Sequence, residues 1–149
     1  MAKVFLLGDS TCAQKSPDVY PETGWGMCFG KHLAKGWTAD NRAINGRSTK
    51  MFLDEGAFAA CLSDLHGGDY GIIQFGHNEN KMDEERHTEP WTSYSANLRY
   101  MAQSILQKGG HPVFPAAIFL MGNTSCIPSG IILKQWKPLR ETCHCLSLT

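Results

Sequence analysis

Short apolar runs alternate along the chain with longer segments whose apolar positions recur at helical spacing. The runs at 4–7 and 70–75 are rich in large apolar residues and are bounded by Gly or Asp, which predicts buried strands. We interpret the first as a central strand of a parallel sheet. A weaker strand is predicted over 37–44, and a fourth over 113–119, where Pro115 indicates a sheet edge or a bulge.

Helical segments connect these strands. The apolar positions between 25 and 35 fit a helix imperfectly, and residues 51–65 predict one or two short helices. A polar loop at 79–90 leads into a long helix at 91–108, with an apolar stripe of Leu98, Met101, Ala102, Ile105 and Leu106. This alternation predicts one α/β domain over 1–149, with three αβα layers around a mostly parallel sheet.

Three polar blocks follow the predicted strands. The first is Gly8 to Ser10, the second is 41–48, and the third is Gly76 to Asn78. Ser10 and Gly46 are 36 residues apart, and Gly46 and Asn78 are 32 apart, each about the length of one βαβ unit. All three blocks are therefore expected at the carboxyl edge of the sheet, where open α/β sheets bind ligands.

The residue types in these blocks fit acyl transfer. Each alone is an ordinary turn or cap residue. Together, the Ser10 hydroxyl provides a nucleophile, and the N–H groups of Ser10 and Gly46 and the side-chain amide of Asn78 provide donors for a tetrahedral oxyanion. The sequence around Ser10 is not the GxSxG elbow of α/β-hydrolases. The blocks therefore predict a serine esterase with a different arrangement of its catalytic residues.

Composition and charge exclude several classes of partner. The 149 residues are 42% hydrophobic, which suits one compact core, and the 14 basic and 14 acidic residues are interspersed. No basic stripe is present to bind nucleic acid, and no apolar run is long enough to span a membrane. The N-terminal residues lack the pattern of an export signal, so a cytoplasmic location is expected for the chain as written.

The six cysteines do not predict a metal site. They lack the paired spacing of zinc ligands, and reduced thiols are the expected state. Cys143, His144 and Cys145 are adjacent, and on a strand they would point to opposite faces. We expect neither a metal nor a cofactor.

The three blocks resemble the SGNH, or GDSL-type, hydrolase family, and most closely its rhamnogalacturonan acetylesterase-like branch. The matching stretches are LLGDST at 6–11, TGWG at 23–26, NRAINGRSTKMF at 41–52 and IIQFGHNENK at 72–81, and the resemblance extends to about Phe119. It implies a flavodoxin-like fold and acetyl esters of pectic polysaccharides as substrates. Members of the family are often secreted.

The resemblance also implies site roles. Ser10 would attack the ester, and Ser10, Gly46 and Asn78 would line the oxyanion hole. In this branch an Asp usually follows the asparagine, whereas Glu79 stands here, which keeps the charge on a longer arm. We interpret this departure as minor.

The family's histidine base is missing from its usual place. The family has an Asp and, three residues later, a His near the C-terminus, but no Asp-x-x-His occurs in this chain. Glu141 and His144 have the same separation and are the candidate substitute pair. Strand geometry argues against them, because His144 would lie at the amino end of the last strand, far from the catalytic edge. The other histidines are better interpreted as solvated, capping or loop-orienting residues.

Residues 120–149 are atypical. They hold three of the six cysteines and only one of the 14 acidic residues. Our hypothesis is that this tail is divergent, truncated or partly translated out of frame, so that the fold is C-terminally incomplete and esterase activity is impaired. Sequencing the gene through and beyond codon 149 tests it, because an Asp-x-x-His encoded just downstream, in any frame, supports loss of the base.

Two other functions compete with the esterase. A non-catalytic module could bind a carbohydrate or acyl ligand in the same pocket, and a flavodoxin-like binder of phosphate or nucleotides ranks last because no Gly-rich phosphate loop is present. The candidate substrate-binding side chains are Asp9, Trp25 and His77, although Trp25 is equally interpreted as core. The expected partner is a small-molecule or polysaccharide ester, and the oligomeric state is not predicted.

Overall fold

A parallel four-stranded sheet forms the centre of the molecule. The computed structural model describes residues 2–115. The strands are β1 (Ala2–Gly8), β2 (Trp37–Asn41), β3 (Tyr70–Gln74) and β4 (His111–Val113), and their order across the sheet is β2-β1-β3-β4. Every neighbouring pair is parallel. The prediction of a parallel sheet with a central first strand is confirmed.

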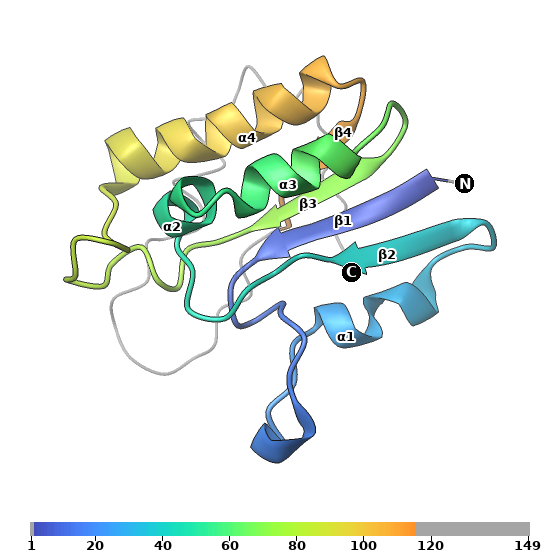
Figure 1. Cartoon of the computed structure of the whole chain (residues 1–149), viewed down its shortest axis with the longest axis horizontal. Helices are drawn as coiled ribbons and strands as arrows, with labels where there is room; N and C mark the ends of the chain where they lie inside the picture. The colour runs from blue at the N-terminus through green and yellow to red at the C-terminus, as the bar shows by residue number, and fades with distance from the viewer. Residues whose placement is uncertain (1, 116–149) are drawn as a thin grey trace.

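Helices cover both faces of this sheet (Figure 1). In chain order they are η1 (Pro17–Val19), α1 (Gly26–Phe29), η2 (Gly30–His32), α2 (Thr49–Asp54), α3 (Ala57–Asp64), η3 (Pro90–Tyr94) and α4 (Ser95–Gln107). Figure 1 shows α2, α3 and α4 on one face and α1 on the other. This three-layer α/β arrangement is the predicted fold. Among the helices of residues 2–115, none is long and apolar enough to cross a membrane.

The alternation of side chains along β1 explains why its sequence is continuously apolar. Phe5 and Leu7 belong to the core beneath α2, α3 and α4, whereas Val4 and Leu6 belong to the core on the α1 side. Successive residues of a strand point to opposite faces, so a strand that is covered on both sides needs apolar residues at every position.

The α4 stripe packs nearly as predicted. Leu98, Met101, Ala102 and Ile105 are buried, whereas Leu106 is only partly buried. Ser104, which is not part of the predicted stripe, is also buried. Its burial is tolerated because its hydroxyl donates to the backbone carbonyl of Tyr100 at 2.8 Å.

Several boundaries differ from the predictions. The helix expected at 25–35 is limited to two short turns between Gly26 and His32, a segment that lacks side-chain caps. The fourth strand begins at His111 and ends at Val113, before Pro115. Its Pro112 is tolerated because β4 pairs with β3 alone among the described strands. Residues 116–119, the candidate pair Glu141 and His144, and the 120–149 tail lie outside the described residues.

Candidate active site

The three polar blocks meet at the carboxyl edge of the sheet. Gly8, the last residue of β1, pairs with Gln74, the last residue of β3, and Asn41 ends β2 beside Leu6. The chain runs from β1 outward to β2 on one side and continues through β3 on the other, so the β1 and β3 ends form a topological switch point. Ser10 lies two residues beyond β1 in this position.

Ser10 lies in a single tight turn that Asp9 organises. The backbone N–H groups of Cys12 and Ala13 both donate to the carbonyl of Asp9, at 3.1 and 3.0 Å. The Asp9 carboxylate accepts from the N–H and the hydroxyl of Thr11, at 2.9 and 2.8 Å. Asp9 is fully buried. Its side chain faces the turn, and the contact of Asp9 with substrate stays a prediction.

Gln74 connects this turn to Trp25. Its Oε1 lies 2.7 Å from the Thr11 hydroxyl oxygen, whose single proton is shared between Gln74 and Asp9, and accepts from the Trp25 indole N–H at 3.3 Å. Trp25 also packs edge-on against Phe29, with ring centroids 5.6 Å apart, and against the α1-side core. Trp25 is thus partly buried against this core, and its contact with substrate stays a prediction. Sequence reasoning missed Gln74 because a glutamine at a strand end has no distinctive pattern.

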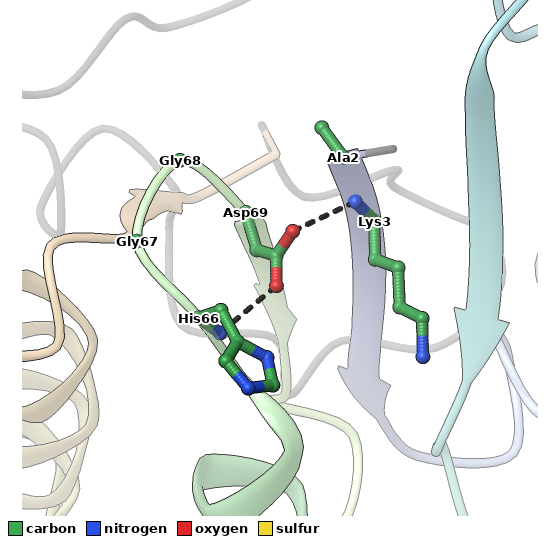
Figure 2. Close-up of a pocket in the computed structure, with 6 residues that line it drawn as sticks. All are labelled: Ala2, Lys3, His66, Gly67, Gly68 and Asp69. Atoms are coloured by element: carbon green, nitrogen blue, oxygen red, sulfur yellow. Dashed lines mark hydrogen bonds between the residues drawn. The ribbon is translucent and has the colours of Figure 1, made fainter.

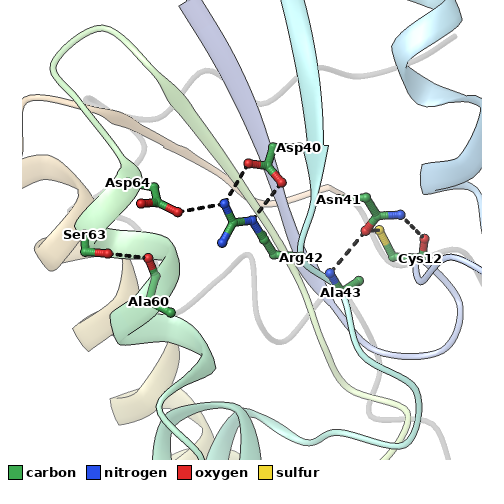
Figure 3. Close-up of polar contacts among 8 residues, drawn as sticks. All are labelled: Cys12, Asp40, Asn41, Arg42, Ala43, Ala60, Ser63 and Asp64. Carbon is green, nitrogen blue, oxygen red and sulfur yellow. Dashed lines mark hydrogen bonds and ion pairs between the residues drawn. The ribbon is translucent and has the colours of Figure 1, made fainter.

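Asn41 fixes the start of the second block to the Ser10 turn. Its side-chain amide donates to the carbonyl of Cys12 at 3.0 Å, and its Oδ1 accepts from the N–H of Ala43 at 3.1 Å (Figure 3). Gly26 passes so close that a Cβ there would be 2.5 Å from the Asn41 amide nitrogen, which explains the second glycine of TGWG. Burial raises the pKa of the Cys12 thiol to about 12, which favours its protonated form near neutral pH.

Figure 3 also shows a separate ion-pair network on the other side of β2. The Arg42 guanidinium donates to Asp40 at 2.7 Å and to Asp64 of α3 at 2.8 Å. The Arg42 side chain hydrogen-bonds Asp40 and holds the pKa of that carboxyl below its usual range. These partly exposed groups attach α3 to the end of β2 and to the start of the second block.

Hydrogen bonds connect the loop that contains Gly46 to residues of the first block and of the segment that follows it. The N–H of Ile44 donates to the carbonyl of Gly8 at 3.0 Å. The Lys15 ammonium donates to the Asn45 side chain at 2.9 Å, while it pairs with Glu22 at 2.6 Å. Only 3% of the Lys15 side chain is exposed. Gly46 itself has φ +74°, the left-handed conformation that glycine adopts without strain.

The third block contacts the second through two consecutive side chains. Asn78 is buried, and its amide Nδ2 donates to the backbone carbonyl of Arg47 at 3.0 Å. The neighbouring Glu79 carboxylate accepts from the N–H of Thr49, the first residue of α2, at 2.5 Å. His77, between Gly76 and Asn78, is exposed beside them.

Glu79 is buried rather than part of the polar loop in which the sequence placed it. Only 1% of the residue is exposed. The pKa of its carboxyl is raised to about 7, mainly by burial and to a smaller extent by the nearby Asp9 carboxylate, while hydrogen bonding to Thr49 acts in the opposite direction. Burial also raises the pKa of Tyr94, whose hydroxyl donates to the carbonyl of Phe75 at 2.9 Å.

The arrangement leaves candidate oxyanion donors unpaired. Among the hydrogen bonds within residues 2–115, none has the backbone N–H of Ser10 or of Gly46 as its donor. Asn78 uses one amide bond on Arg47, and a carboxamide has two N–H groups. These are the donors that the sequence predicted, and their use on a substrate stays a prediction.

The described histidines do not offer an evident base. His87 contacts the Glu89 carboxylate, but its other ring nitrogen is also engaged, with the carbonyl of Lys81 at 3.1 Å. His32 lies on η2, and His111 begins β4. His66 follows the end of α3.

A surface hollow lies at the opposite, amino end of the sheet (Figure 2). Its volume is about 390 Å³, and Lys3, His66 and Asp69 contribute to its lining. Asp69 accepts from the N–H groups of Lys3 and His66, at 2.8 and 2.9 Å, and so joins β1 to the loop after α3. This hollow is remote from the three blocks. Within residues 2–115, no three acidic, His or Cys side chains gather as metal ligands.

The chain is similar to a curated enzyme over most of its length. It is 39% identical to the rhamnogalacturonan acetylesterase RhgT of Bacillus subtilis over 116 residues, which cover 78% of this chain and 49% of the relative. The chain thus spans about half the length of this relative. A scan against models of known protein families finds no match.

Solved structures share the fold. Protein YxiM of Bacillus subtilis matches with a TM-score of 0.76 at 21% identity, over 95% of this chain and 42% of that one. An assigned SGNH hydrolase from Slackia heliotrinireducens matches with a TM-score of 0.60 at 13% identity, over 95% of this chain and 75% of that one. Together with the sequence match, these likenesses confirm the resemblance seen in the three blocks. The chain thus has the fold of these solved structures, one of them an SGNH hydrolase, and is similar in sequence to a rhamnogalacturonan acetylesterase.

Proposed function

We propose that this chain carries the nucleophile and the oxyanion donors of a serine esterase that removes acetyl or other short acyl groups from pectin-type carbohydrates. The observation that carries the proposal is the bond from the Asn78 amide to the carbonyl of Arg47, because it brings the third block against the residue after Gly46. The similarity to a rhamnogalacturonan acetylesterase supports the substrate class.

In the proposed reaction the Ser10 hydroxyl oxygen attacks the ester carbonyl carbon, and its proton passes to a base. The carbonyl oxygen becomes an oxyanion that accepts hydrogen bonds from the N–H groups of Ser10 and Gly46 and from the Asn78 amide. The intermediate collapses to an acyl-enzyme, the bond to the leaving oxygen breaks, and the base returns its proton to that oxygen, which departs as the alcohol. Water then attacks the acyl carbon, which releases the carboxylic acid and restores the Ser10 hydroxyl.

The base limits the rate. The chain holds no Asp-x-x-His, and an enzyme of this type without its histidine keeps only about a thousandfold to ten-thousandfold catalysis over water. We therefore expect slow hydrolysis by this chain. His144 with Glu141 is the candidate substitute pair, and His144→Ala tests it: an unchanged rate contradicts the role.

Hydrolysis of p-nitrophenyl acetate, with Ser10→Ala as control, tests the esterase. Labelling by a fluorophosphonate, located by peptide mass spectrometry, tests the nucleophile without turnover. We expect serine-dependent hydrolysis and a label on Ser10. Equal rates of the chain and of Ser10→Ala, with no label on Ser10, would contradict the proposal.

A second candidate is a non-catalytic module that binds a carbohydrate or acyl ligand at the same edge. It is favoured by the histidine arrangement, because within residues 2–115 the histidine that contacts a carboxylate, His87, has both ring nitrogens engaged. Calorimetric titration with acetylated rhamnogalacturonan oligosaccharides separates the two. Binding that Ser10→Ala retains, without hydrolysis by either form, supports the module.

A further inference from the structure

Two consecutive residues of the loop after β3 hold the segment that follows Gly46. Asn78 donates to the carbonyl of Arg47 at 3.0 Å, and Glu79 accepts from the N–H of Thr49 at 2.5 Å. One bond uses a side-chain donor and the other a side-chain acceptor, so the segment is fixed at two points two residues apart. These two bonds restrain the segment that directly follows Gly46 relative to the loop after β3.

The bond to Thr49 satisfies a backbone group that its helix leaves unpaired. Thr49 is the first residue of α2, and the first N–H groups of a helix have no partner within it. Ser48 caps the N–H of Met51, so the Thr49 N–H depends on Glu79. The Thr49 hydroxyl accepts from the Asn97 amide of α4 at 3.1 Å. Glu79 therefore joins the start of α2 to its surroundings.

Burial of the Glu79 carboxyl group is unfavourable for the stability of the fold. Glu79 is 1% exposed, and within the described residues its Oε2 has no hydrogen-bond partner. A buried polar atom without a partner destabilises the fold, and an apolar side chain would avoid that cost. An apolar side chain could not accept the hydrogen bond that the Glu79 carboxyl accepts from the Thr49 N–H.

We propose that Glu79 is a positioning residue that holds Gly46 in place through its bond to Thr49. The proposal rests on the proposed function, because it assigns Gly46 a role in binding the oxyanion. Glu79 itself does not touch the ester in this proposal. Its effect is on the geometry of the donors, which matters most when the oxyanion forms.

The charge of Glu79 changes near neutral pH, which provides an observable. Among residues 2–115, the titratable groups that face its carboxyl are Asp9 from the turn after β1 and Tyr94 from η3. Burial, and then the Asp9 carboxylate, raises the pKa of Glu79 to about 7. A carboxylate is a stronger acceptor than a neutral carboxyl, so the bond to the Thr49 N–H should strengthen as pH rises.

NMR of the full chain tests this without any substrate. We expect the amide proton of Thr49 to move downfield as pH rises, with the same midpoint near 7 as the Glu79 side-chain carbon, and the Gly46 amide to move with it. Glu79→Gln keeps an oxygen acceptor but cannot titrate, so both amide titrations should vanish. Glu85→Gln, at an exposed position of the same loop, should leave them unchanged.

Glu79→Met removes the acceptor while keeping the chain length. We expect amide exchange at Thr49 about tenfold faster than in the unchanged protein, because an unbonded N–H is open to solvent. Titration of neither amide, or the same titration in Glu79→Gln, would overturn the proposal. If Glu79→Met fails to fold, the titrations of the unchanged protein and of Glu79→Gln still decide.

Kinetics separates this proposal from the esterase itself. If Ser10 is labelled by a fluorophosphonate, we expect Glu79→Met to lower kcat for p-nitrophenyl acetate by about tenfold or more, with KM changed by less than about twofold, and Glu79→Gln to restore most of kcat. Equal kcat in Glu79→Met and the unchanged protein would overturn the positioning role. An unlabelled Ser10 contradicts the proposed function, while the amide titrations still decide whether Glu79 holds Gly46.

Discussion

The side-chain amide of Asn78 lies 3.0 Å from the backbone carbonyl of Arg47, 31 residues away in sequence. This bond joins the loop after β3 to the loop after β2. The loop after β2 also contacts the first block, since Ile44 donates to the carbonyl of Gly8, and Gln74 at the end of β3 contacts Thr11 of the Ser10 turn. The three blocks therefore form one connected structure at the carboxyl edge of the sheet.

Asn78→Ala removes this bond and a proposed oxyanion donor together. We expect a loss of about a hundredfold to a thousandfold in kcat for p-nitrophenyl acetate, because a donor of this kind acts mainly in the transition state. The loss of stability should be about 1 kcal/mol in urea denaturation, as for one buried hydrogen bond. Lys81→Ala, at an exposed position nearby, is the control, and a kcat reduced equally in both variants would argue against the donor role.

Gly46→Ala tests the backbone conformation of the second block. At φ +74° an alanine is strained, and nothing lies within 4 Å of where its Cβ would stand, so the cost is that of the backbone alone. We expect a loss of about 1–2 kcal/mol in the free energy of unfolding. Gly30→Ala is a matched control, since Gly30 has a helical φ of −59° and its added Cβ would make ordinary contact with Ala39. If both variants unfold alike, the strain is absent.

Glu79 should make stability depend on pH. Its pKa is about 7 in the folded chain and about 4.5 when unfolded, so between these values the folded chain binds the proton more tightly. The free energy of unfolding should therefore fall as pH rises from about 4.5 to 7, by about 3 kcal/mol, and level off above. Urea denaturation across this range measures it. In Glu79→Gln this fall in the free energy of unfolding should disappear. If the variant shows the same dependence on pH, the dependence belongs to other titratable groups.

Met101→Ala tests the core beneath α4. Met101 is a fully buried residue of the core that α4 forms with the sheet. Its truncation leaves a cavity, so the free energy of unfolding should fall by about 2–5 kcal/mol. Gln103→Ala, at an exposed position of the same helix, should change the free energy of unfolding by less than about 0.5 kcal/mol. Thermal or urea unfolding measures both, and equal effects would contradict the packing described.

The order of strands and helices was determined by the sequence alone, because it depends on local patterns. Runs such as 4–7 fit a strand buried on both faces, and the stripe of the 91–108 segment fits a helix buried on one. Ser10, Gly46 and Asn78 could be found in the same way. Each follows a strand, and parallel strands have their carboxyl ends at one edge of the sheet.

Only the tertiary structure decided what the neighbouring polar residues do. Glu79 begins a stretch that is polar in sequence, yet it is buried beneath α2 because Thr49, 30 residues away, needs an acceptor. Asp9 likewise faces its own turn, and Gln74 accepts from Trp25 across 49 residues of sequence. Partners so far apart leave no local pattern, since their bonds depend on how strands and helices come together in space.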